Sequence, residues 1–381
     1  MLNALVKKQK LIITLFLFYL AVCPTVMVTS GIMRLFPTLA LSFFLFCGII
    51  SWSRIKYARM GILIKCFAIF IIFNALITES AYGNSMITII KSTFWVSIYG
   101  LSYVFFEGSC IEKKNYQKWV FIISTIIMLV FYVSHNIRLT EIGDGAGDNV
   151  IFYSLMLIPW MSHIQDKRCK WIIIACLFFC TLLSLKRSST IIFGSAVAIT
   201  YFSDFIFKKK IEVSTLLMGV IIVVSMIGVL NFASDKVAIV AQRFESIEDD
   251  GGSGRDEIYE DVFSRYSTGS IKQKIFGRGF DGVRRDSSYL IPVSAHNDFL
   301  EVLYDFGVIG FFFYLLIHLS LIKWMICLFR ARSQLAFPVL ISYVCFLVMS
   351  LVSHLILYPT YFGLLTAFWA YAECEDNKLK K

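Results

Sequence analysis

Apolar runs long enough to cross a bilayer recur along most of the chain, separated by short polar connections. A helix of about twenty apolar residues spans the roughly 30 Å hydrocarbon core of a membrane. The pattern predicts twelve such helices and therefore an all-α polytopic membrane protein. They lie at Leu11–Thr29, Leu35–Trp52, Met60–Thr78, Met86–Phe106, Trp119–Ser134, Val150–Met161, Trp171–Leu185, Ser189–Phe207, Val213–Phe232, Val308–Met325, Leu335–Leu357 and Tyr361–Tyr371. The first run lacks a clear small-residue cleavage site, so we expect it to remain as a signal anchor.

One long hydrophilic segment interrupts this pattern between the ninth and tenth predicted spans. Ala233–Ala295 carries nine Lys and Arg against eleven Asp and Glu, so its net charge is slight. A loop of this length in a compact protein is usually functional. We therefore expect three parts: spans one to nine over residues 1–232, a large outer loop with the catalytic residues over 233–298, and spans ten to twelve over 299–381.

The composition excludes a water-soluble protein. The 381 residues are 58% hydrophobic and 16% charged, with a mean hydropathy of +0.73, whereas soluble domains are about 45–50% apolar and about 25% charged. With 36 Phe and 6 Pro, the chain is also unlike a disordered one. The ten cysteines include no CxxC pair and none lies in the loop, which argues against a disulfide framework or a zinc site.

The formal charge of +10 is explained by topology rather than by one binding face. With the N-terminus in the cytoplasm, the cytoplasmic connections and termini hold twenty Lys and Arg, and the short outer loops hold four. Cytoplasmic loops of membrane proteins carry such an excess of cations. We therefore expect both termini in the cytoplasm and the large loop on the outer side. The same distribution removes nucleic acid as a partner.

Within the loop, Ser253–Asp256 has the pattern of a helix start. Ser253 and Asp256 fit a capping box, and apolar residues at helical spacing follow. The N–H groups of a helix start attract anions, and Arg255 would lie in the first turn. The segment predicts a phosphate or pyrophosphate site, with an ordinary capped surface helix as the alternative.

A second candidate begins at His296 and Asn297. The residues that follow form an apolar stripe and an acidic stripe at helical spacing: Phe299, Leu300, Leu303 and Phe306, and Asp298, Glu301 and Asp305. This spacing predicts an amphipathic helix that enters the membrane and is broken near Gly307 and Gly310. His296 would lie at the water–lipid boundary, where imidazole can act as a general base, with Glu301 as an orienting partner. A polar interfacial histidine is the alternative. The other histidines lack comparable neighbours and are expected to be structural: His135, His163, His318 and His354.

The third candidate is the outer turn Lys186–Ser189, whose two cations go against the charge bias of the other outer loops. Arg187 would lie close to the membrane plane, within reach of a lipid-linked phosphate that a guanidinium binds through two parallel hydrogen bonds. Headgroup anchoring is the alternative. Arg138 and Arg278 are weaker candidates of the same kind. No P-loop, GxSxG, HExxH or EF-hand pattern occurs, so we expect neither a metal nor a cofactor.

Taken together, these features resemble the bacterial O-antigen ligase/polymerase superfamily of membrane glycosyltransferases. The similarity is strongest over Ser253–Phe313, and the twelve spans with one large outer loop before the tenth also fit. Its motifs are Ser253-Gly254-Arg255, Phe276-Gly277-Arg278-Gly279-Phe280, His296-Asn297 with Leu300-Glu301, and Gly307-Val308-Ile309-Gly310. The resemblance implies a GT-C-like fold in the bacterial inner membrane, with its active site facing the periplasm.

The resemblance also implies the metal-independent transfer of a glycan from undecaprenyl pyrophosphate to a sugar hydroxyl. The partners would be lipid-linked glycan donor and acceptor, the lipid bilayer and a chain-length regulator protein as a candidate. By position, His296 would be the general base, and Arg187 and Arg255 would stabilise the pyrophosphate as it leaves. The substrate-binding residues would be Asn297, Glu301, Arg278 and Arg138.

Polymerase, ligase and transporter remain as alternatives. A polymerase transfers the glycan to another lipid-linked repeat unit, and a ligase transfers it to the lipid A–core. Ligases of the superfamily tend to carry a second histidine just before the His-Asn pair, whereas this chain has Val293-Ser294-Ala295, which favours a polymerase. A flippase or other transporter would be expected to show internal repeats and charges near mid-membrane, whereas this sequence has no repeat, few central charges and one dominant outer loop.

Overall fold

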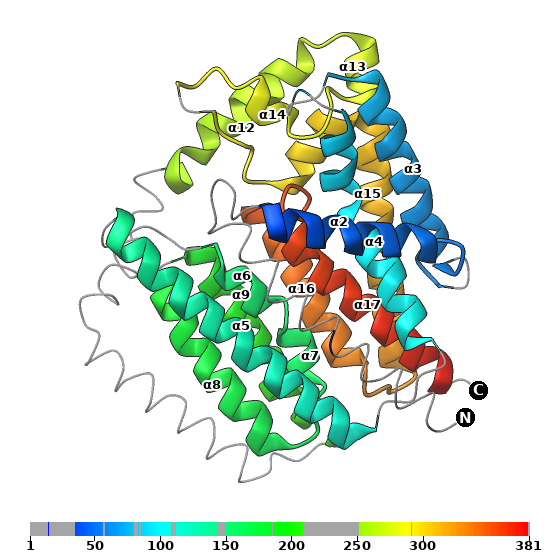
Figure 1. Ribbon diagram of the computed structural model, residues 1–381, viewed down its shortest axis with the longest axis vertical. Helices are drawn as coiled ribbons and strands as arrows, with labels where there is room; N and C mark the ends of the chain where they lie inside the picture. Colours follow the sequence, from blue (N-terminus) through cyan, green and yellow to red (C-terminus); the bar gives the residue numbers. More distant parts are fainter. Residues whose placement is uncertain are drawn as a thin grey trace. The chain divides into compact units, whose positions relative to one another are not determined.

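The computed structural model describes residues 14, 35–55, 58–79, 83, 85–107, 112–142, 149–184, 186–208, 251–290 and 292–379, and the regular elements in these ranges are all helices (Figure 1). The chain divides into two units. The first is Met1–Leu41, Ser109–Ser246 and Leu328–Cys345, and the second is Ser42–Gly108, Ile247–Cys327 and Phe346–Lys381. Except for Thr14, the first and ninth predicted spans lie outside the described residues, as does the start of the predicted loop up to residue 250.

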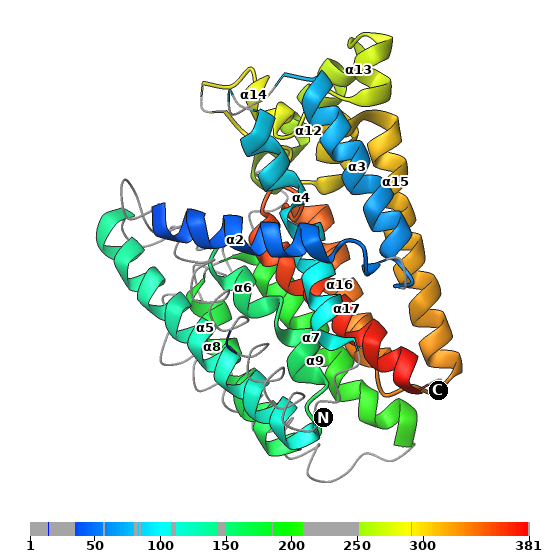
Figure 2. The same ribbon diagram turned by 45° about the vertical axis from the view of Figure 1, so that its right-hand side comes forward.

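The first unit is built on helices α5 to α9, whose bounds are Lys113–Ile142, Ile151–Leu155, Ile158–Ser162, Lys167–Leu183 and Arg187–Lys208. Helix α8 packs against α5 and α9, and α6 packs against all three (Figure 2). The carboxylate of Asp166 caps α8 by accepting the N–H groups of Arg168 and Cys169 at 2.9 and 3.3 Å. Asp166 has the extended backbone and the side-chain acceptor that are typical of the residue that caps a helix N-terminus.

The sixth predicted span, Val150–Met161, is wrong as a single helix. The structure has two short helices, α6 and α7, separated at Met156 and Leu157. Pro159 lies in the first turn of α7. Proline has no N–H to donate and its ring collides with the carbonyl four residues earlier, so a helix cannot continue through it undisturbed.

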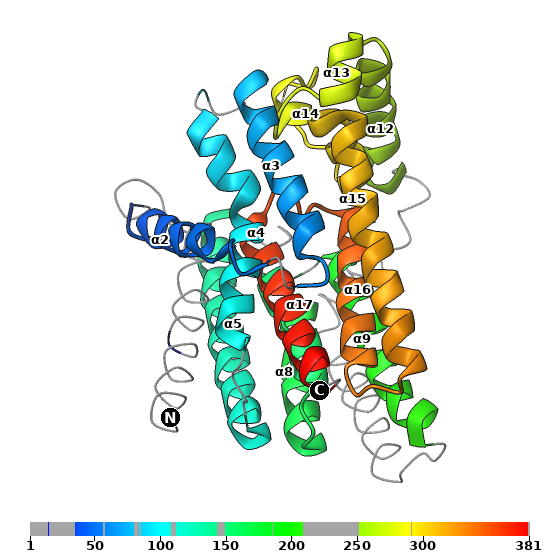
Figure 3. The same ribbon diagram turned by 90° about the vertical axis from the view of Figure 1, so that its right-hand side faces the viewer.

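The second unit contains α3 (Gly61–Ile77), α4 (Ser85–Phe106), α17 (Pro359–Leu379) and most of α15 (Asp298–Arg330). Helix α4 packs along α17 and against α3. Helices α3 and α15 lie side by side (Figure 3). The rings of Phe67 and Phe313 stack between them, with 5.8 Å between the ring centres. Two further helices contribute residues to both units, because the division of the chain falls inside them. They are α2 (Leu35–Ser51) and α16 (Ala336–Val352).

Three short helices of the large loop gather at the N-terminal end of α15 (Figure 3). They are α12 (Gly251–Ser267), α13 (Ile271–Phe276) and α14 (Gly282–Arg285). The prediction that Ser253 caps the first of them is wrong, because Ser253 lies inside α12 and a cap residue has non-helical backbone angles. A capping box does occur in this loop, at the start of α13, where Ser270 and Gln273 accept each other's backbone N–H groups.

Several helices are apolar enough for a membrane. Three described helices have both the length and the composition of a span: Ser85–Phe106, Lys113–Ile137 and Asp298–Arg330. Shorter apolar helices are Leu39–Ser51, Gly61–Ile77 and Ala336–Val352, and the segment Ile151–Ser162, which contains α6 and α7, is also apolar. The predicted all-helical class is confirmed for the described residues, whereas the count of twelve spans stays a prediction.

Glycines allow the loop backbone to lie directly on the backbone of α15. The N–H groups of Arg278 and Gly279 donate to the carbonyls of Tyr304 and Asp305 at 3.0 and 2.8 Å. Gly307 interrupts α15 with φ +64°, which confirms the predicted break. A Cβ at Gly307 would overlap the carbonyl of Ile275, so this contact requires glycine both for space and for its backbone angle.

We therefore expect Gly307→Ala to destabilise the second unit by about 1–3 kcal/mol, through left-handed strain and the overlap with Ile275. The matched control is Gly194→Ala in α9, where an added Cβ meets nothing within 4 Å. Thermal unfolding of the detergent-solubilised variants should show a lower Tm for Gly307→Ala alone. Equal Tm values for Gly307→Ala and the wild type would contradict the tight backbone contact.

Candidate functional site

Three fully buried carboxylates lie on one face of α15: Asp298, Glu301 and Asp305. Their spacing of three and four residues places them on one side of the helix. The acidic stripe predicted from the sequence lies inside the protein, where its carboxylates accept backbone N–H groups of neighbouring segments. A buried carboxylate requires such donors to replace the water that it has lost.

Asp305 fixes helix α14. Its two carboxylate oxygens accept the N–H groups of Asp281, Gly282 and Val283 at 2.6, 2.9 and 3.2 Å. These donors are the first turn of α14 and the residue before it, so the carboxylate of one helix caps another. The contact ties the loop to α15 just before the break at Gly307.

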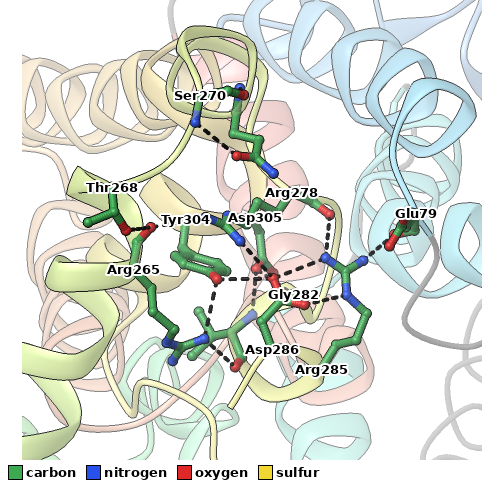
Figure 4. Close-up of polar contacts among 12 residues, drawn as sticks. Glu79, Arg265, Thr268, Ser270, Arg278, Gly282, Arg285, Asp286, Tyr304 and Asp305 are labelled. Atoms are coloured by element: carbon green, nitrogen blue, oxygen red, sulfur yellow. Dashed lines mark hydrogen bonds and ion pairs between the residues drawn. The ribbon is translucent and has the colours of Figure 1, made fainter. Parts of the chain in front are cut away.

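A cluster of arginines surrounds Tyr304, the residue before Asp305 (Figure 4). The guanidiniums of Arg265 and Arg278 lie 5.1 and 5.2 Å from the centre of its ring, within the range of a cation–π interaction. The Tyr304 hydroxyl donates to Asp286 at 3.0 Å, and Asp286 is also paired with Arg278 at 3.5 Å and Arg285 at 2.7 Å. Arg278, predicted to bind substrate, therefore has protein partners on two sides.

Asp286 is held in its ionised form. Burial raises the pKa of this carboxyl, but the hydrogen bond and charge of Arg285, the Tyr304 hydroxyl and the charge of Arg278 together lower the pKa below its ordinary value of 3.8. The hydrogen bond to Asp286 raises the pKa of Arg285 in turn. Arg285 also donates to the carbonyls of Glu79 and Arg278 at 2.6 and 3.1 Å, so the pair joins the loop to the end of α3.

The segment that carries His296 is fixed on both sides of the histidine. The Glu301 carboxylate accepts the N–H of Ala295 at 2.8 Å, immediately before it. Asn297, immediately after it, caps α15 by accepting the N–H groups of Phe299 and Leu300 at 2.9 and 3.3 Å. The two predicted substrate-binding residues in this segment, Glu301 and Asn297, thus hold its backbone.

His296 has a strained backbone and a half-buried side chain. Its φ of +53° lies in the left-handed region, which non-glycine residues seldom adopt. Such strain persists only where surrounding contacts determine it, and it is enriched at functional sites. The imidazole of His296 lies against that of His354, with 4.5 Å between ring centres. His354 was expected to be structural, because nothing near it in the sequence indicates this contact.

Arg255 lies in α12 with a half-buried side chain. Within the part of the loop that the structure describes, Arg265, Arg278, Arg284 and Arg285 each pair with an aspartate, whereas Arg255 makes no hydrogen bond or ion pair. Among these arginines, Arg255 is thus the one whose guanidinium is not committed to a protein carboxylate. An anion is the kind of ligand that such a group binds.

Arg187 and Arg138 belong to the first unit. Arg187 begins α9, after a turn that hydroxyl groups close: the Ser184 and Ser189 oxygens are 2.8 Å apart, and Ser189 donates to the Lys186 carbonyl at 2.7 Å. Arg138 lies near the C-terminal end of α5, and its side chain is outside what the structure describes.

Comparison with known proteins adds one finding. A family model described as O-antigen ligase matches residues 172–315. These residues run from α8 through the large loop into α15, and they contain Arg187, Arg255 and His296. The resemblance expected from the motifs is thus confirmed over this region, although the match does not distinguish a ligase from a polymerase. No curated protein matches the chain.

Over the described residues, no group of three or more His, Cys, Asp or Glu could hold a metal ion.

The low pKa of Asp286 predicts how stability depends on pH. A carboxyl whose pKa is lowered by folding contributes stability above its unfolded pKa, near 3.8, and loses that contribution as the pH falls through the folded value. Asp286→Asn keeps the shape and removes the charge, so its Tm should lie below that of the wild type at pH 7, and the difference should shrink at pH 3. Asp256→Asn, at an exposed position in α12, is the control. If Asp286→Asn lowers the Tm by the same amount at pH 7 and pH 3, the lowered pKa of Asp286 is not what stabilises the fold.

Proposed function

Since a family model described as O-antigen ligase matches residues 172–315, we propose that the chain is an O-antigen polymerase. In this proposal it joins undecaprenyl-pyrophosphate-linked oligosaccharide repeat units at the periplasmic face of a bacterial inner membrane. Donor and acceptor are both lipid-linked glycans, and the apolar helices hold the protein beside them. A chain-length regulator protein is a candidate partner.

The proposed reaction is a glycosyl transfer in which a sugar hydroxyl replaces a pyrophosphate. The acceptor oxygen bonds to the anomeric carbon of the donor glycan, and the hydroxyl proton passes to the imidazole of His296. The bond between that carbon and the pyrophosphate oxygen breaks, and undecaprenyl pyrophosphate leaves with the bonding electrons. General bases of this kind accelerate transfer about 10²–10⁴-fold.

The observation that carries the proposal is the placement of His296 inside the matched domain. Its imidazole is half-buried on a backbone that hydrogen bonds fix at the residues before and after it. The left-handed φ of +53° supports a functional role, since a glycine or asparagine would adopt that angle with less strain. A base must be held at a fixed place relative to the bound hydroxyl, and this segment meets that requirement.

Arginines stabilise the leaving group in this proposal. Negative charge accumulates on the pyrophosphate as the glycosidic bond breaks, and a guanidinium close to the membrane opposes that charge in a medium of low dielectric constant. Arg255 is proposed because, in the described loop, its side chain is not paired with a carboxylate. Arg187 is proposed from its position in the matched domain at the start of α9.

The choice of polymerase rests on the residue before His296. The chain has Val293-Ser294-Ala295 immediately before His296, whereas ligases of the superfamily tend to carry a second histidine there. A ligase is the second candidate, because the matching family model is described as O-antigen ligase.

Lipopolysaccharide from a strain lacking this gene separates the two candidates. For a polymerase, the gel should show lipid A–core capped with a single repeat unit. Uncapped core, together with accumulated lipid-linked glycan, would instead identify a ligase. Plasmids encoding His296→Ala or Arg255→Ala should give no long-chain ladder although the variants insert normally, whereas Lys272→Ala, at an exposed position of α13, should restore it. A full ladder from either site variant would contradict the role assigned to that residue.

We also propose that the transfer proceeds without a metal ion, because pyrophosphate is a good leaving group and arginines can neutralise it. Chain elongation by the purified protein should therefore continue at an unchanged rate after addition of EDTA. Activity that disappears with the chelator and returns with a divalent cation would contradict this part of the mechanism.

A further inference from the structure

The structure brings a second histidine to the candidate base. His354 lies between α16 and α17 and is almost completely buried, whereas His296 is half-buried. Their ring centres are 4.5 Å apart and the ring planes are inclined by 34°, which is the spacing of offset aromatic packing. One face of the His296 imidazole is therefore covered by a ring from a distant part of the chain.

The same buried carboxylate holds both histidine segments. Asp298, two residues after His296, accepts the N–H of Leu355 at 3.0 Å and that of Ile356 at 3.4 Å. These two donors directly follow His354. Because the carboxylate is fully buried at the start of α15, it fixes the backbone that carries His354 relative to the helix that begins after His296.

Further hydrogen bonds fix this carboxylate and the His354 segment. The Tyr314 hydroxyl donates to Asp298 at 3.0 Å and lies 2.7 Å from the Ser350 hydroxyl of α16. The Tyr361 hydroxyl donates to the carbonyl of His354 at 2.8 Å. The backbone of His354 is thus held from α15 and from α17, independently of its imidazole.

We propose that His354 is a positioning residue for glycan transfer. Its ring packs against that of His296 and restricts the side-chain rotation of the base, so that an imidazole nitrogen stays directed to the acceptor hydroxyl. This role rests on the proposed function, in which His296 receives the hydroxyl proton. His354 itself does not receive that proton. It lies outside the residues that the O-antigen ligase model matches, and the sequence alone had assigned it a structural role.

Two substitutions of similar size separate ring packing from simple space filling. Phenylalanine at position 354 keeps a flat ring against His296, whereas leucine fills the buried volume without one. A displacement of about 1 Å in a catalytic group can lower the rate about 10²-fold. We therefore expect His354→Leu to lower kcat about tenfold or more with KM nearly unchanged, and His354→Phe to retain kcat within about threefold of the wild type.

The measurement is chain elongation by purified protein in liposomes, with a synthetic undecaprenyl-pyrophosphate-linked repeat unit as donor and acceptor. His163→Phe is the control, because that histidine packs edge-on against Tyr116 in the first unit, with 5.4 Å between ring centres. It should leave kcat unchanged. Folding of each variant is checked by size-exclusion chromatography and Tm.

The outcomes distinguish this inference from the proposed function. Wild-type kcat for His354→Leu would overturn the positioning role. Equal losses in the Leu and Phe variants would also overturn it, because ring packing would then not be what matters at this position. If His296→Ala is inactive while His354→Leu is fully active, only the positioning role fails. If His296→Ala is active, the proposed base itself is wrong.

Discussion

The geometry of the candidate site depends on backbone N–H groups that donate to buried carboxylates of α15. Asp305 binds the start of α14, Glu301 binds the residue before His296, and Asp298 binds the segment after His354. A buried backbone N–H that loses its hydrogen-bond partner costs about 1–3 kcal/mol. One helix end therefore positions three separate segments, and the pattern explains why acidic residues occur in an apolar helix.

Several charged residues of the described loop serve to build the candidate site. Arg265, Arg278 and Arg285 are engaged with Tyr304 and aspartates, so their charges stabilise the loop. Arg255, which pairs with no carboxylate in the described part of the loop, and the half-buried ring of His296 both lie inside the region that the O-antigen ligase family model matches. The proposed transfer of a glycan from a pyrophosphate uses Arg255 and His296, whereas the paired arginines stabilise the loop that carries Arg255.

The sequence predicted the helical class, the helix that begins after His296 and its break at Gly307, because hydropathy, glycine and local spacing are properties of neighbouring residues. It could not predict which side of α15 the acidic stripe would face. The periodicity of a helix separates two faces but does not say whether water or loop N–H groups satisfy the polar one. The partnership of His296 with His354 was also hidden, since it arises only when Asp298 brings the two segments together.

The most direct test is an experimental structure of the protein with a lipid-linked donor and a glycan acceptor bound. If His296 is the general base, the acceptor hydroxyl oxygen will lie within about 3.2 Å of a ring nitrogen of His296, and the guanidinium of Arg255 will contact the pyrophosphate. An acceptor hydroxyl hydrogen-bonded to another side chain, with the His296 ring turned away from it, would contradict the role of His296 as the base.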